Sequence, residues 1–206
     1  MRIRVVVSLI LVVAAISALS STVAAADNWP NWRGPQGTGV AADGDYPVQF
    51  SSEEGVAWKV RLPGVGTSTP AVWDEQVFLT CGVDGQDTVL CYDMQGNELW
   101  RRQLGPEREP KRAHSSGSNP SPATDGKYVV VYYKSGAVGC FDLQGNEQWK
   151  LNLQSRYGED TLWWDLGTSP VLAGDMAIIA VMQDGDSYLV ALGLVLLTGV
   201  GGMTSF

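Results

Sequence analysis

Short apolar runs separated by turn residues dominate the chain after residue 55. The runs Gln76–Cys81 and Lys127–Tyr133 are rich in Val, Phe, Tyr and Thr, and glycine turns follow them at Asp84-Gly85 and Ser135-Gly136. Runs of this kind, bounded by turn residues, predict β-strands joined in hairpins. Nowhere does a long stretch repeat its apolar residues with the 3.6-residue period of a helix, so the pattern predicts an all-β protein.

An internal repeat organises these strands. The segment Asp93–Arg101 recurs as Asp142–Lys150, an offset of 49 residues that keeps the Asp, Gln, Gly, Asn, Glu and Trp. A repeat of about 40–50 residues with four strands has the size of a β-propeller blade, and such a unit cannot bury both of its faces alone. Each unit begins at a Ser/Thr-Pro pair. The pairs are Thr69-Pro70, Ser121-Pro122 and Ser169-Pro170.

The last strand of each unit is predicted to carry a tryptophan. The pattern Trp-Lys/Arg-x-x-Leu marks these strands at Trp100 and Trp149, and it also occurs earlier at Trp58–Leu62. We therefore expect the closing strand of one more blade before the first full repeat. Pro opens the first strand of each unit, where a missing backbone N–H matters least.

The turn before each of these tryptophans has a repeated chemistry. Asp93 and Asp142 are expected to accept backbone N–H groups, while Gly96 and Gly145 supply the positive φ of a tight hairpin. Paired catalytic carboxylates are the alternative for the two Asp residues. Their identical place in a turn favours capping.

The ending Asp-x-x-Gly-x-x-x-Trp resembles that of the propellers with pyrroloquinoline-quinone-like (PQQ-like) repeats. This family includes bacterial quinoprotein dehydrogenases and the BamB-like periplasmic scaffolds of outer-membrane β-barrel assembly. The opening Trp29–Pro35 is similar to that of a group of secreted bacterial propellers. The resemblance covers about residues 29–192. It implies a propeller of four-stranded antiparallel blades, about seven or eight when complete and about three here, with Trp58, Trp100 and Trp149 docking between adjacent blades.

The first residues predict export. Two Arg residues precede an apolar run from Val5 to Ala18, and Ala24 and Ala26 fit a signal-peptidase site. The run is shorter than the roughly 20 residues of a membrane span; an uncleaved anchor is the alternative. The expected organisation is a signal peptide over 1–26, an N-terminal segment over 27–55 and a partial propeller over 56–192. We expect the mature protein in the periplasm or outside the cell, with no membrane span.

The third unit ends differently from the other two. Aligning Pro70 with Pro170 places Gly193 where the first unit has Asp93, and residues 193–206 contain no Asp, no Trp and no charged side chain. We interpret residues 193–206 as an aberrant, foreign or frameshifted tail on a truncated propeller; a genuine short variant is the alternative. Open blade faces on such a protein are expected to associate with other surfaces.

Charge narrows the range of partners. The formal net charge is −8, and it becomes −10 when Arg2 and Arg4 leave with the signal peptide. Nucleic acids and anionic membranes are disfavoured as partners, because binding to them needs clustered Lys and Arg.

Candidate chemistry is sparse. His114, the only histidine, lies in a polar loop without a second His for a metal, and it is assigned no role. Cys81, Cys91 and Cys140 allow at most one disulfide; we read them as small buried strand residues, with Cys81 facing Cys91 as the alternative. The adjacent Cys pair typical of quinoprotein dehydrogenases is absent. No catalytic, cofactor-binding or metal-binding residue is assigned, and neither PQQ nor calcium is expected.

Trp163 and Trp164 stand in an irregular segment just before the third Ser-Pro pair. Exposed aromatics in an interblade loop would suit a protein or carbohydrate ligand, whereas packing under the loop is the alternative. The function predicted is that of a non-catalytic, exported scaffold that binds such a ligand. A fragment of a PQQ-dependent alcohol or sugar dehydrogenase is the alternative function.

Overall fold

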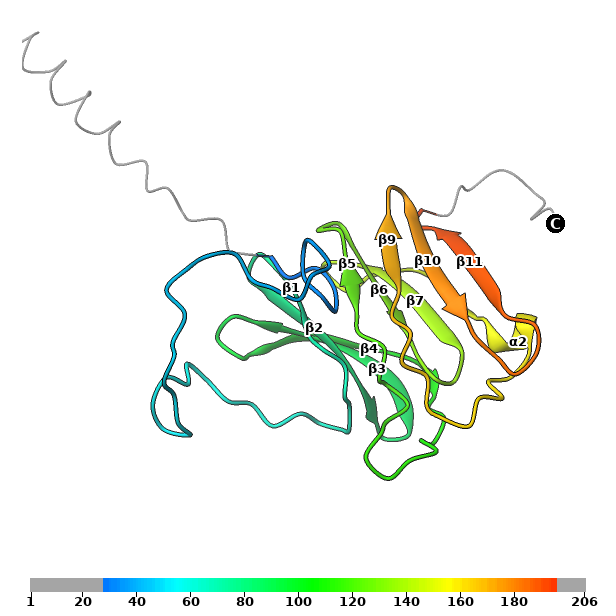
Figure 1. Ribbon diagram of the computed structural model, residues 1–206, viewed down its shortest axis with the longest axis horizontal. Coiled ribbons are helices and arrows are strands. Elements are labelled where there is room, and N and C mark those ends of the chain that lie inside the picture. The colour runs from blue at the N-terminus through cyan, green and yellow to red at the C-terminus, as the bar shows by residue number, and fades with distance from the viewer. Residues whose placement is uncertain (1–27, 196–206) are drawn as a thin grey trace, which may run out of the picture.

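The computed structural model describes residues 28–195, whose strands form three antiparallel sheets lying side by side (Figure 1). The first sheet contains β1 (Ala71–Trp73), β2 (Gln76–Val83), β3 (Gln86–Asp93) and β4 (Glu98–Pro106) in that order. The second contains β5 (Ala123–Thr124), β6 (Tyr128–Tyr132), β7 (Ala137–Asp142) and β8 (Glu147–Asn152), followed by the short helix α2 (Gln154–Tyr157). The third contains β9 (Val171–Ala173), β10 (Met176–Val181) and β11 (Tyr188–Gly193).

These sheets confirm the predicted propeller blades. Each begins directly after a Ser/Thr-Pro pair, and in the first two sheets the tryptophan lies on the fourth strand. The third sheet has three strands within the described residues. The predicted signal peptide and most of the predicted tail, residues 196–206, lie outside the described part of the chain.

The middle strands of the sheets, such as β6, are continuous apolar runs because both of their faces are covered. Along β6, Val129 and Val131 pack into the core shared with the first sheet, whereas Val130 and Tyr132 pack into the core shared with the third. Alternate residues of a strand point to opposite faces, so one run supplies two cores. A blade in this fold is thus stabilised mainly by its neighbours.

The segment Trp58–Leu62 is not a strand, which corrects the expectation of a closing strand there. A fourth strand needs the third strand of its own sheet as hydrogen-bonding partner, and residues 28–57 supply no such strand. The segment instead reaches the outer face of the first sheet, where Leu62 packs against the buried cluster that includes Leu79 and Tyr92.

The three cysteines are free and buried. Cys81 pairs in register with Thr88, and Cys91 with Phe78, so the two cysteines of this hairpin do not face each other. Burial raises the pKa of Cys81 to about 11 and the pKa values of Cys91 and Cys140 to about 12. Protonated buried thiols are poor nucleophiles and poor metal ligands.

Candidate functional site

The repeated tryptophans lie against the turn of the following sheet. Trp100 and Trp149 are buried, whereas Trp58 is partly exposed. In each case the indole N–H donates to a backbone oxygen of the sheet that follows in the sequence. The acceptor is the residue directly after the third strand of that sheet. The pairs are Trp58 to Met94 at 2.7 Å, Trp100 to Leu143 at 3.0 Å and Trp149 to Leu194 at 3.2 Å.

The turn glycines make room for these rings. Gly96 and Gly145 have φ values of 83° and 79°, in the left-handed region. A Cβ atom on Gly96 would lie 2.8 Å from the ring of Trp58, and one on Gly145 would lie 2.6 Å from the ring of Trp100. Each turn therefore needs glycine at this position for two reasons. The backbone has a positive φ, and a side chain would collide with the ring of the preceding Trp.

The turn aspartates have identical partners in the two complete sheets. Oδ1 of Asp93 accepts from the backbone N–H groups of Gln95 and Asn97 at 2.9 and 2.8 Å, and Oδ2 accepts from the Asn97 side chain. Asp142 makes the same contacts two and four residues further on. The hydrogen bonds from Asn97, chiefly that of its side chain, hold the pKa of Asp93 below its usual value. Each carboxylate thus accepts hydrogen bonds from its own turn and stabilises that turn.

A ladder of hydroxyl groups joins the sheets near their first strands, and sequence reasoning missed it. The backbone N–H of Thr69 donates to Oγ of Ser121, and the N–H of Ser121 donates to Oγ of Ser169, both at 2.9 Å. These are the residues before the repeated prolines. The sequence feature that could have predicted these bonds is the Ser or Thr that precedes the proline in every unit.

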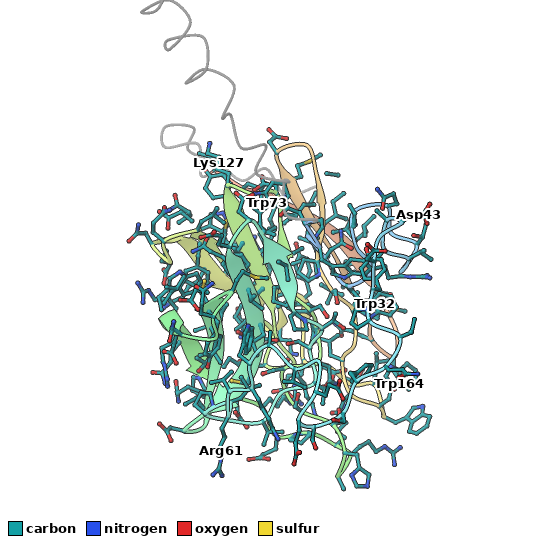
Figure 2. The ribbon with its side chains drawn as sticks, turned by 90° about the vertical axis from the view of Figure 1, so that its left-hand side faces the viewer. Trp32, Asp43, Arg61, Trp73, Lys127 and Trp164 are labelled. Carbon is teal, nitrogen blue, oxygen red and sulfur yellow. The ribbon has the colours of Figure 1, made fainter. Side chains whose placement is uncertain are left out.

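Trp163 and Trp164 project from the loop between α2 and β9. Their side chains are 66% and 43% exposed, and their rings meet edge to face with centroids 5.4 Å apart. The guanidinium of Arg112, from the loop after β4, lies 4.7 Å from the centroid of Trp163, within cation–π range. We call these three residues the tryptophan surface. Figure 2 shows Trp164 and Arg61 at the end of the molecule opposite Trp73 and Lys127.

A buried ion pair clamps the two loops that carry the tryptophan surface. Lys134 and Asp165 bond to each other with side chains 1% and 3% exposed, and Nζ of Lys134 also donates to the backbone oxygen of Glu109 at 2.6 Å. Asp165 accepts from the backbone N–H groups of Lys111 and Arg112 at 2.8 and 3.1 Å. Burial raises the pKa of Asp165, but the hydrogen bonds from Lys111 and Lys134 outweigh it and hold the pKa below its usual value. The loops therefore meet through a charged, fully bonded contact.

Comparison with known proteins identifies the repeats. The family model described as outer membrane protein assembly factor BamB matches residues 19–194. The chain belongs to this family. No curated protein matches it.

Two solved structures were found to be similar to parts of the chain. One is a quinohemoprotein alcohol dehydrogenase from Comamonas testosteroni, 17% identical, with a TM-score of 0.62 over 84% of this chain and 26% of the dehydrogenase. The other is BamB from Moraxella catarrhalis, 16% identical, with a TM-score of 0.46 over 66% of this chain and 39% of that one. The chain thus spans about a quarter of the dehydrogenase, and at 17% identity the likeness to it shows the fold alone.

Between residues 28 and 195, no three side chains of His, Cys, Asp or Glu gather closely enough to hold a metal ion. His114 is exposed in its loop. No helix in this part of the chain is long and apolar enough to cross a membrane.

Proposed function

We propose that this BamB-family chain is an exported scaffold that binds a protein partner through the tryptophan surface. The observation that carries the proposal is the exposure of two adjacent indoles with an arginine stacked on one of them. Trp and Arg are the residues most enriched at the energetic centres of protein interfaces. The family name, outer membrane protein assembly factor, supports a partner from that assembly process and a periplasmic location.

The clamp beneath the surface favours tight binding. Ordering a loop at the moment of association costs free energy, and a loop that is already fixed avoids this cost. Lys134 and Asp165 fix the loop from below, while Leu162 and Leu166 anchor it on both sides of the tryptophans by packing into the interior. The indoles are held outward by the same contacts that keep the loop in place.

Crosslinking in the host cell tests the proposal. A photoreactive aromatic amino acid at position 164 of the intact protein should capture a component or client of outer-membrane protein assembly, identified by mass spectrometry. The matched control carries the same group at Lys127, which is exposed at the opposite end of the molecule (Figure 2). Equal adducts at both positions, or none at position 164, would refute partner binding by this surface.

The alternative function, part of a PQQ-dependent dehydrogenase, is supported by the fold likeness to the alcohol dehydrogenase. Adding quinone and calcium to the intact protein separates the two functions. Stoichiometric uptake seen by cofactor absorbance, together with dye-linked alcohol oxidation, would overturn the scaffold. A scaffold function predicts neither uptake of the quinone nor oxidation of the alcohol.

A further inference from the structure

A pocket of about 670 Å³ lies beside the first strands of the sheets and shares no residue with the tryptophan surface. Its walls come from the N-terminal loop, from β5 and from β9 with the residues just before it. This volume falls within the range of about 300–1,000 Å³ that is usual for small-molecule sites. The loop carries the Trp29–Pro35 segment, to which the proposed partner binding assigns no role.

The N-terminal loop is fastened to two blades. Trp29 and Val72 exchange two backbone hydrogen bonds, of 2.9 and 2.8 Å, which adds a bridge alongside β1. The backbone N–H of Thr124 in β5 donates to the oxygen of Pro30 at 2.8 Å. The loop therefore has a fixed position relative to the inner strands.

Internal contacts also hold the shape of the loop. Oδ1 of Asn31 accepts from the backbone N–H of Arg33 at 3.1 Å, and Nη2 of Arg33 donates to the backbone oxygen of Thr38 at 2.8 Å. Gly34 has a φ of 73°, and a Cβ there would lie 2.9 Å from the ring of Trp29. A pocket wall with this bracing is preformed, which lowers the cost of binding.

The lining combines aromatic faces with unused hydrogen-bonding groups. Trp32 is 59% exposed at the pocket, and Trp73 forms part of the wall. The indole N–H of Trp32 and the hydroxyl of Thr168 donate to no residue between 28 and 195. Asp125 is fixed by bonds from the Lys127 and Tyr128 N–H groups to Oδ1, which leaves Oδ2 as an acceptor.

We propose that this pocket binds an uncharged oligosaccharide. The pyranose ring has an apolar C–H face that stacks on an indole, and its hydroxyls both donate and accept, as the lining requires. The pocket contains one cation, Arg33, and one anion, Asp125, so it has no excess charge to attract an ionic ligand. The inference does not rest on the proposed partner binding, because the two sites share no residue.

Calorimetric titration of the intact protein tests the proposal, with maltotriose, cellotriose and tri-N-acetylchitotriose as probes. At least one should bind saturably, and Trp32→Ala should weaken its binding about tenfold or more, which corresponds to about 1.4 kcal/mol. The matched control is Trp163→Ala, which removes an indole of similar exposure from the other site and should leave sugar binding unchanged. Circular dichroism and the unfolding midpoint check that Trp32→Ala is folded. Thr168→Val, which removes only a hydroxyl, should also weaken binding.

Three outcomes would overturn the inference. The first is no saturable binding of any of the three sugars at millimolar concentration. The second is equal affinity in the wild type and in the Trp32→Ala and Thr168→Val variants. The third is loss of binding in Trp163→Ala with retention in Trp32→Ala, which would place the sugar on the tryptophan surface. Partner crosslinking at position 164 is unaffected by any of these results, so the two proposals fail separately.

Discussion

The indole nitrogen of Trp149 donates a hydrogen bond to the backbone oxygen of Leu194, 3.2 Å away at the end of the next sheet. Trp100 bonds to Leu143 in the same way at 3.0 Å. Each indole is thus held by a neighbouring blade, and its ring belongs to the core shared with that blade. The contact between blades is a repeated structural unit in its own right.

Replacing Trp149 by Ala should lower the free energy of unfolding by about 3–5 kcal/mol, because it removes a large aromatic side chain from a packed interface. Trp163→Ala is the control, since that side chain is mostly exposed, and it should change the value by less than about 0.5 kcal/mol. Denaturant unfolding of both variants measures the difference. Similar midpoints would show that Trp149 contributes no packing between blades.

Gly145→Ala should destabilise the protein more than Gly174→Ala does. Both glycines have positive φ, 79° and 59°, so both substitutions strain the backbone. Only at Gly145 would the new Cβ meet a ring, 2.6 Å from Trp100, whereas nothing lies within 4 Å at Gly174. The difference between the two unfolding free energies isolates the contact with Trp100. Equal losses would mean that the Trp100 ring moves aside freely.

Stability should fall as the pH rises from about 4 to about 7 because of Asp87. This carboxyl is buried in β3; its Oδ2 accepts from Oγ of Ser135 at 2.5 Å, and its Oδ1 has no partner. Burial raises its pKa from 3.8 to about 7, opposed by the Ser135 bond and reinforced by Glu107. The folded state therefore keeps a proton that the unfolded chain releases above pH 3.8, and this contribution is lost once the pH passes about 7.

Asp87→Asn tests this dependence, since the amide has the same shape and cannot ionise. The free energy of unfolding of the variant should change less between about pH 5 and pH 8 than that of the wild type. A variant with the same pH slope as the wild type would show that another group is responsible.

Export predicts a defined N-terminus. Cleavage after Ala26 leaves Asp27 as the first residue, and mass spectrometry of the exported protein should find it there. Recovery of the chain with Met1 intact would favour the uncleaved anchor.

The sequence predicts best what is local and repeated. Each blade turn is visible because the carboxylates of Asp93 and Asp142 accept hydrogen bonds from residues two and four positions further on, so the motif contains these partners. The strand at Trp58–Leu62 was predicted wrongly for the opposite reason. Its side-chain pattern matches the other closing strands, but a strand also needs a backbone partner, and that partner is not part of the pattern.

Contacts between distant residues were harder to predict. The hydroxyl ladder joins residues 48 and 52 positions apart, so its chemistry emerges only when the blades are placed side by side. The loop that carries Trp163 and Trp164 is joined to the second sheet by the ion pair between Lys134 and Asp165, 31 positions apart. The sequence predicted that the two tryptophans could form a binding surface, with burial under the loop as the alternative. The fold shows that they are exposed.

The ladder from Thr69 through Ser121 to Ser169 has a consequence for how such proteins change in evolution. Each rung joins a residue to its own counterpart one unit further along, and each tryptophan bonds to the same turn position of the next unit. A gene duplication that inserts one more unit of about 50 residues would join an existing interface to a copy of itself, and a deletion would rejoin two compatible halves. The number of blades can therefore grow or shrink by recombination without the invention of any new contact.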